Sequence, residues 1–147
     1  MKKQGLRSDC PINYPLEIIG DKWSLLIIRD IAIFGKTSYG EFLISDEKIA
    51  TNILSNRLSM LEAKGIVSKK QDPANKTKFI YSLAQPGLDF LPLLIEMLIW
   101  SAKQYSIEAE PDASLAKMAC ENRQRLIDMI QMHLQAGNKE PFVQTLQ

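Results

Sequence analysis

One stretch in the middle of this chain constrains its fold more than any other. Residues 50–64 have helical spacing, with leucines on one side and small, polar or basic residues on the other. Gly65 then supplies a stop for the helix. Residues 66–71 and 78–83 contain β-branched and aromatic residues, and the Asp, Pro and Asn between them are turn formers. The pattern predicts a helix that leads directly into a β-hairpin.

The residues before this stretch predict two more helices. Residues 15–35 are apolar on most sides, as in a central helix, with a break near Gly20 and an end at Gly35. A short helix is expected at 39–44, with Ser38 as its N-cap. The order of helix, short helix, polar-faced helix and hairpin is that of a winged helix-turn-helix. The expected fold class is α+β and mainly helical, with a two-stranded wing.

Two further helices are predicted after the hairpin. Residues 86–105 form a long helix that is apolar on two sides, and Pro92 is expected to kink it or tighten its first turns. One small domain rarely buries both sides, so we expect part of this helix to face a second subunit. A polar stretch at 108–114 indicates a linker. A last helix fits 115–136, ends at Gly137 and is followed by a tail that we expect to fray.

These elements divide the chain into two expected parts. Residues 1–107 form the winged helix-turn-helix domain with a dimerisation helix, and residues 108–147 form a C-terminal helical extension. The longest apolar run, at 91–100, is interrupted by Glu96 and is too short to span a bilayer. No apolar signal-peptide region follows the basic N-terminus. We therefore expect a cytoplasmic protein that does not bind membranes.

The sequence contains no pattern of residues typical of a catalytic or metal site. Cys10 and Cys120 do not make a disulfide framework, no Cys/His cluster could hold zinc, and His133 stands alone. We find no convincing pair of carboxylates and no phosphate-cradling loop. The sequence predicts no enzyme activity, no cofactor and no metal. Cys120, near the apolar stripe of the last helix, is expected to pack there.

Charge is distributed unevenly along the chain. The formal net charge is only +1, yet residues 48–78 carry seven Lys or Arg against two Asp or Glu. The flanking segments have more acidic than basic residues. A basic middle between acidic flanks fits a local phosphate-binding surface. A solvated basic surface without a partner is the alternative.

The side of residues 50–64 opposite the leucines is where we expect base contacts. An α-helix fits the major groove of DNA, and short polar side chains on its outer face can reach base edges. Hairpin lysines can then lie on neighbouring phosphates. The candidates are Thr51, Asn52, Ser55, Asn56 and Arg57 on the helix and Lys70, Asn75, Lys76 and Lys78 on the hairpin. For any one of them, a solvated surface position is the alternative.

Several blocks of residues between Cys10 and Lys103 resemble the HxlR family of regulators. The most specific are G-D-K-W at 20–23, L-E-A-K-G at 61–65 and Y-S-L at 81–83. The supporting blocks are Cys10-Pro11, Ile19, 25–30, 39–42, 54–58, 66–67 and Trp100. The resemblance implies a dimeric bacterial regulator related to the MarR winged helices. It also implies that N- and C-terminal helices pair across the dimer.

The resemblance singles out Cys10 and exposes two departures. Cys10 matches an N-terminal cysteine that senses oxidants or electrophiles in some members of the family; a small buried thiol without a switch is the alternative. Ala84 stands where the family often has a threonine that caps the long helix. Ser38 stands where a basic residue is usual, which removes one expected phosphate contact.

Together these observations predict a DNA-binding transcriptional regulator that acts as a homodimer on a palindromic operator. Its effector would be a small molecule or an oxidant, with Cys10 as the candidate redox sensor. The alternative is a protein-interaction winged-helix module without specific DNA binding, which the modest net charge and Ser38 favour. Affinity for DNA that falls steeply with salt separates the two, because only phosphate binding releases counterions.

Overall fold

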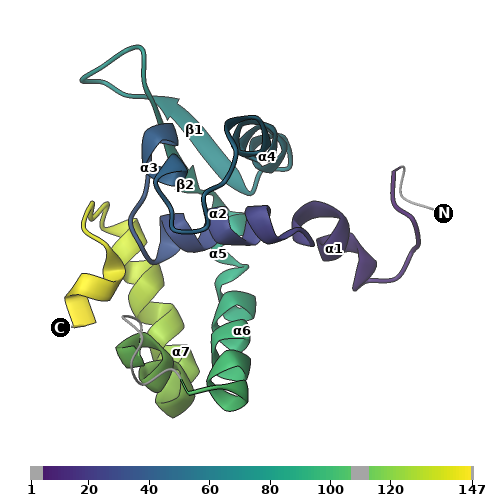
Figure 1. Ribbon diagram of the computed structural model, residues 1–147, viewed down its shortest axis with the longest axis vertical. Helices are drawn as coiled ribbons and strands as arrows, with labels where there is room; N and C mark the ends of the chain where they lie inside the picture. The colour runs from purple at the N-terminus through teal and green to yellow at the C-terminus, as the bar shows by residue number, and fades with distance from the viewer. Residues whose placement is uncertain (1–4, 107–112, 147) are drawn as a thin grey trace.

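The computed structural model describes residues 5–106 and 113–146 of the chain (Figure 1). The described residues are mainly helical, with a two-stranded antiparallel sheet. The elements are α1 (Asn13–Ile19), α2 (Lys22–Ala32), α3 (Tyr39–Leu43), α4 (Thr51–Ala63), β1 (Val67–Gln71), β2 (Phe79–Leu83), α5 (Gln85–Leu88), α6 (Leu91–Gln104), α7 (Ala113–Gln135) and the 3-10 helix η1 (Phe142–Leu146). The predicted fold class and the predicted order from the first helix to the hairpin are confirmed.

The predicted break between the first two helices lies at Gly20. A Cβ at this position would lie 2.3 Å from the carbonyl oxygen of Leu16, which only glycine avoids. Asp21 then begins α2, because its Oδ1 accepts a hydrogen bond from the backbone N–H of Ser24 at 2.9 Å. The helix ends at Ala32, earlier than the expected Gly35. Gly35 instead turns the chain toward α3 with a φ of +66°.

Helix α2 crosses the middle of the molecule and is the centre of the core (Figure 1). It contacts α4 and β2 on one side and α6 on the other. The buried apolar residues around it, which we call the head core, are Ile18, Ile19, Ile27, Ile28, Ile31, Phe42, Ile49, Leu54, Leu58, Leu61, Ile66, Val67 and Tyr81. Because α2 has neighbours on most sides, most of its sides are apolar.

The hairpin has the predicted turn chemistry. Strands β1 and β2 pair antiparallel, with Val67 opposite Leu83 and Gln71 opposite Phe79. At the turn, the side chain of Asp72 accepts a hydrogen bond from the backbone N–H of Ala74 at 2.8 Å. This is the local side-chain capping that makes Asp a good turn residue. The hairpin is the wing of a winged helix-turn-helix.

The long helix after the wing is divided into α5 and α6. Pro92 lies in the first turn of α6, where its missing N–H and its ring oppose an uninterrupted helix. The sequence predicted one helix over 86–105 with a kink or a tightened turn, and the structure has two helices instead. Ala84 occupies the N-cap of α5 and makes no side-chain capping bond, so the predicted weak cap is confirmed. Leu91 and Ile95 are buried, whereas Leu93, Met97 and Trp100 are exposed. These exposed side chains belong to the face that we expected to meet a second subunit.

A second cluster of buried residues joins the end of α2 to α6, α7 and η1. Phe142 belongs to it and is only 2% exposed. The expectation of a frayed tail was therefore wrong, because an aromatic side chain close to the C-terminus finds a buried place beside Ala32 and Ile33. Helix α7 begins at Ala113 and has a non-helical residue, Asn122, inside it.

The expected domain boundary at residues 107–108, and residues 108–112 of the expected linker, lie outside the described residues. Across 5–106 and 113–146, no helix is both long and apolar enough to cross a membrane.

Candidate nucleic-acid interface

Helix α4 and the wing lie at one end of the molecule, and α6 and α7 lie at the other (Figure 1). Leu54, Leu58 and Leu61 anchor α4 in the head core. Because helical spacing places the intervening residues on the opposite side, the polar face of α4 points outward. The predicted residues exposed on that face are Thr51, Asn52, Ser55 and Asn56.

The N-terminal end of α4 is held by α3. The phenolic hydroxyl of Tyr39 donates a hydrogen bond to the carbonyl oxygen of Thr51 at 2.8 Å. Helix α3 is itself fixed by a capping box in which Ser38 and Glu41 cap each other's backbone N–H groups. Burial acts to raise the pKa of Glu41, but hydrogen bonds from Thr37 and Ser38 outweigh it and lower the pKa. Ser38 thus serves the fold of the helix-turn-helix.

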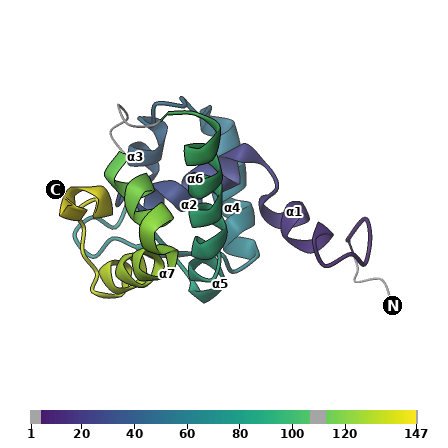
Figure 2. The same cartoon turned by 90° about the horizontal axis from the view of Figure 1, so that it is seen from below.

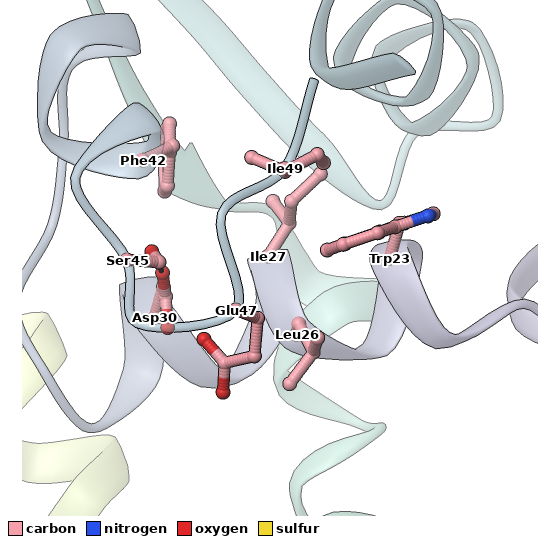
Figure 3. Close-up of a pocket in the computed structure, with 8 residues that line it drawn as sticks. All are labelled: Trp23, Leu26, Ile27, Asp30, Phe42, Ser45, Glu47 and Ile49. Carbon is pink, nitrogen blue, oxygen red and sulfur yellow. Dashed lines mark hydrogen bonds between the residues drawn. The ribbon is translucent and has the colours of Figure 1, made fainter. Parts of the chain in front are cut away.

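A buried carboxylate fixes the turn between α3 and α4 (Figure 3). Asp30 on α2 accepts a hydrogen bond from Ser45 Oγ at 2.6 Å and an ion-pair contact from Lys36 Nζ at 2.9 Å. Lys36 Nζ also donates to Ser45 Oγ at 2.6 Å. Because a buried charge is costly without partners, this three-residue cluster holds together the elements that carry it. Sequence reasoning missed it; the available signal was a carboxylate, Asp30, next to the apolar residues that mark α2 as a central helix.

Arg29 and Glu47 extend this cluster at the surface. Arg29 makes two hydrogen bonds to the Glu47 carboxylate, one of them from Nη2 to Oε2 at 3.1 Å, and it also contacts Asp30. The hydrogen bond from Arg29 lowers the pKa of Glu47 to about 2. Burial acts to lower the pKa of Arg29, but its bonds to Glu47 and Asp30 prevail and raise it. Both groups therefore stay charged at neutral pH and connect α2 to the α3–α4 turn.

Arg57 is placed differently from the other predicted residues of α4. It is half-buried, and its Nε lies 3.6 Å from Asp21 Oδ1 at the start of α2. Its Nη1 lies 3.6 Å from the sulfur of Met60 on the same helix. Nε is one of the buried side-chain atoms in the described chain that make no hydrogen bond. In this conformation the guanidinium faces α2 rather than the outer face of α4.

The four predicted wing residues, Lys70, Asn75, Lys76 and Lys78, are all exposed. Asn75 also has a structural task, because its Oδ1 accepts hydrogen bonds from the backbone N–H and the hydroxyl of Thr77, at 3.1 and 2.7 Å. Lys69, which was not predicted, lies with its ammonium 4.2 Å from the ring centroid of Phe79. The wing therefore presents exposed lysines around a turn that side-chain hydrogen bonds hold together.

Both cysteines are exposed free thiols. Cys10 lies just before α1, with its carbonyl oxygen accepting from the N–H of Asn13 at 2.9 Å. The alternative of a buried thiol is therefore wrong for Cys10. Cys120 was expected to pack in the apolar stripe of α7, and this is also wrong, since neighbouring Ala116 and Ala119 occupy the buried side of the helix.

Helices α2, α3 and α4 share one buried core, α4 exposes a polar face, and a basic two-stranded wing follows. This arrangement defines a winged helix-turn-helix protein. Its polar helix and wing present donors, acceptors and cations at one end, which is the chemistry of DNA grooves and phosphates. Among the described residues, no group of three or more His, Cys, Asp or Glu could hold a metal ion.

The chain belongs to the HxlR-like helix-turn-helix family, whose model matches residues 18–109. An HTH-type transcriptional regulator of Halalkalibacterium halodurans is 35% identical over 95 residues, covering 65% of this chain and 84% of that protein. The solved structure of PA1607, described as a transcription factor, is similar with a TM-score of 0.61 and 35% identity over 67% of this chain and 68% of that one. The redox regulator HypR in its oxidized form has a TM-score of 0.57 and 26% identity over 66% of this chain and 99% of that one. The protein is therefore a helix-turn-helix transcriptional regulator and not an enzyme.

Proposed function

We propose that this regulator binds duplex DNA as a homodimer on a palindromic operator in the cytoplasm. Residues 1–107 would form the DNA-binding and dimerising domain, and residues 108–147 its C-terminal extension. One observation carries the proposal: α4 buries its leucines and exposes a continuous polar face next to a basic wing. Such a helix can enter the major groove without exposing apolar core residues.

The exposed residues divide into two roles. Asn52 and Asn56 can pair with adenine through their amide groups, and Thr51 and Ser55 can contact base edges or phosphates. The wing contributes phosphate contacts through Lys70, Asn75, Lys76 and Lys78. Arg57 can reach a guanine or a phosphate only if it leaves Asp21, so we propose it as a contact that forms on binding.

Two apolar surfaces support the homodimer. Helix α1 projects from the body of the molecule (Figure 2); Leu16 on this helix is 60% exposed, and Ile12, the residue before it, is 70% exposed. Helix α6 exposes Trp100 to 63%, with Leu93 and Met97 beside it. A second copy of the chain would remove these side chains from water. Two copies of α4 about 34 Å apart would then meet successive turns of one face of the DNA, which requires a palindromic site.

Cys10 is proposed as the oxidant- or electrophile-sensing residue. Its thiol is exposed and lies just before α1, the helix that projects from the body of the molecule, and the similar protein HypR is a redox regulator. Two thiolates that each give one electron to an oxidant join in a disulfide, and a bond at Cys10 would change how α1 meets the second copy. If diamide still releases the Cys10→Ser variant from DNA, Cys10 is not the sensor. Cys120→Ser is the matched control, because Cys120 is the other exposed thiol.

The DNA-binding proposal is tested by fluorescence anisotropy of the reduced protein on duplexes from its own upstream region. Titrations at several salt concentrations, with random DNA as competitor, measure affinity and specificity together. We expect competitor-resistant binding whose logarithmic affinity falls with a slope of about −0.9 per phosphate contacted. Binding equal to that of random DNA on every upstream fragment would instead favour a protein-interaction module.

A further inference from the structure

The C-terminal segment after α7 folds back beside the C-terminal end of α2 (Figure 1, yellow). We call residues 138–143 the C-terminal strap; they lie beyond the family match, which ends at residue 109. His133, which is only 9% exposed, holds the strap to α7. Its Nε2 lies 2.8 Å from the carbonyl oxygen of Glu140, and its Nδ1 lies 3.3 Å from Nδ2 of Asn138. Because a carbonyl only accepts, Nε2 donates and Nδ1 accepts, so both ring nitrogens are used.

The strap is pressed against the connection between α2 and α3. A Cβ added to Gly35 would lie 3.1 Å from the backbone nitrogen of Pro141 and 3.2 Å from the carbonyl of Glu140. The N–H of Val143 donates to the carbonyl oxygen of Ile33 at 3.4 Å. The ring of Phe142 is buried, and its centroid lies 5.5 Å from that of His133 in an edge-on arrangement. Backbone therefore meets backbone at Gly35, with no flexible side chain to absorb a change.

The same connection holds the helix-turn-helix in place. Lys36, the residue after Gly35, reaches Asp30 and Ser45 and so fixes the α3–α4 turn. The backbone N–H of Lys36 also donates to the carbonyl oxygen of Asp30 at 3.0 Å. One residue further on, the carbonyl oxygen of Thr37 accepts from the N–H of Tyr81 in β2 at 2.7 Å. The connection thus touches both the turn that leads into α4 and the wing.

We infer that the C-terminal strap is a positioning element of the DNA-binding head. It holds the α2–α3 connection at Gly35, so that Lys36 stays on the Asp30–Ser45 pair and Thr37 stays on the wing. His133 is the positioning residue that holds the strap. The effect on DNA rests on the proposed DNA-binding function, whereas the effect on the connection does not.

The test compares Gly35→Ala with Gly65→Ala. Both glycines have nearly the same left-handed φ, +66° and +69°, so both variants bear the same backbone strain. A Cβ at Gly65 meets no described atom within 4 Å, whereas at Gly35 it pushes against the strap. His133→Ala and Met132→Ala form a second matched pair, since Met132 is the exposed neighbour of His133 on α7. Circular dichroism checks that every variant folds. If Gly35→Ala does not fold, the comparison of His133→Ala with Met132→Ala tests the inference.

Two readouts are measured on the full chain. Hydrogen exchange followed by mass spectrometry reports the amides of residues 33–50 and of β2, and anisotropy reports operator affinity. We expect Gly35→Ala and His133→Ala to speed exchange in both segments and to weaken operator binding about fivefold or more relative to their controls. Exchange equal to that of the controls would overturn the inference, as would faster exchange with unchanged operator affinity. If the wild-type protein shows no specific DNA binding, the proposed function fails, and the exchange comparison alone still decides whether the strap positions the connection.

Discussion

Arg57 on α4 and Asp21 at the start of α2 form an ion pair, with Nε 3.6 Å from Oδ1. Asp21 also caps α2 through the same oxygen, which accepts from the N–H of Ser24. One carboxylate therefore begins the central helix and holds the DNA-facing helix against it. Helices α2 and α4 are therefore joined by an ion pair as well as by the leucines of the head core.

This pair should be measurable by a double-mutant cycle. Asp21→Asn keeps a capping oxygen but removes the charge, so it isolates the ion pair from the cap. We expect the coupling free energy of unfolding between Asp21→Asn and Arg57→Ala to be about 0.5–1 kcal/mol, because both side chains are partly exposed. Urea unfolding of the four proteins measures it. Strictly additive effects would show that the pair contributes nothing to stability.

We expect α4 to determine which DNA sequence is bound and the wing to contribute affinity for any DNA sequence. Asn56→Ala removes an amide that we propose to read a base, so it should relax discrimination at one operator position by about 1–3 kcal/mol. Lys70→Ala removes a phosphate contact, so it should weaken binding to all sequences and reduce the salt slope by about one. Anisotropy on an operator and its single-base variants tests both. A uniform loss for Asn56→Ala would contradict its role as a base reader.

The proposed dimer depends on the exposed side of α6. Met97→Glu places a charge on that face without disturbing the chain's own core, since Met97 is 45% exposed. We expect the variant to sediment as a folded monomer, because burying an unpaired carboxylate between subunits is costly. Lys103→Glu, another exposed change on α6, is the control. A wild-type protein that is monomeric at micromolar concentration would remove the dimer from the proposal.

Acid should weaken the ion pair between Arg29 and Glu47 and so lower the stability of the fold. The pKa of Glu47 is lowered from 4.5 to about 2 in the folded chain. The folded state therefore binds fewer protons, and the stability from this group is complete above pH 4.5 and is lost as the pH falls through 2. Melting temperatures across this range should fall less steeply for Glu47→Gln than for the wild type. Asp46→Asn, at the exposed residue next to Glu47, is the control. If the melting temperatures of all three proteins fall equally steeply with pH, the ion pair does not stabilise the fold.

A missing cap can be restored at Ala84. Its backbone is extended, with φ −80° and ψ 173°, which is the conformation of an N-cap residue. Ala84→Thr should raise the free energy of unfolding by about 0.5–1 kcal/mol, because the hydroxyl can accept from a free N–H of α5. Ala84→Val has nearly the same shape without the hydroxyl and should not stabilise. Urea unfolding of both variants distinguishes capping from added bulk.

Elements whose causes are local could be predicted from the order of residues. The cap and glutamate of α3, the glycine after α4 and the turn residues of the wing act on neighbours within a few positions, so their effects follow from order alone. The outward face of α4 was likewise predictable, because three leucines at helical spacing determine which side is buried. The family resemblance followed from the same residues.

Features that depend on residues far apart in the chain could be seen only in the folded structure. Arg57 was expected on the outer face, but the start of α2 lies close enough to attract it. Cys120 lies outward because two alanines occupy the buried side of α7, and Phe142 is buried in the cluster that contains Ala32 and Ile33 at the C-terminal end of α2. The cluster of Asp30, Lys36 and Ser45 joins residues from three segments. In these cases the direction of a side chain depends on which surfaces the fold brings together. Local periodicity does not show which surfaces those are.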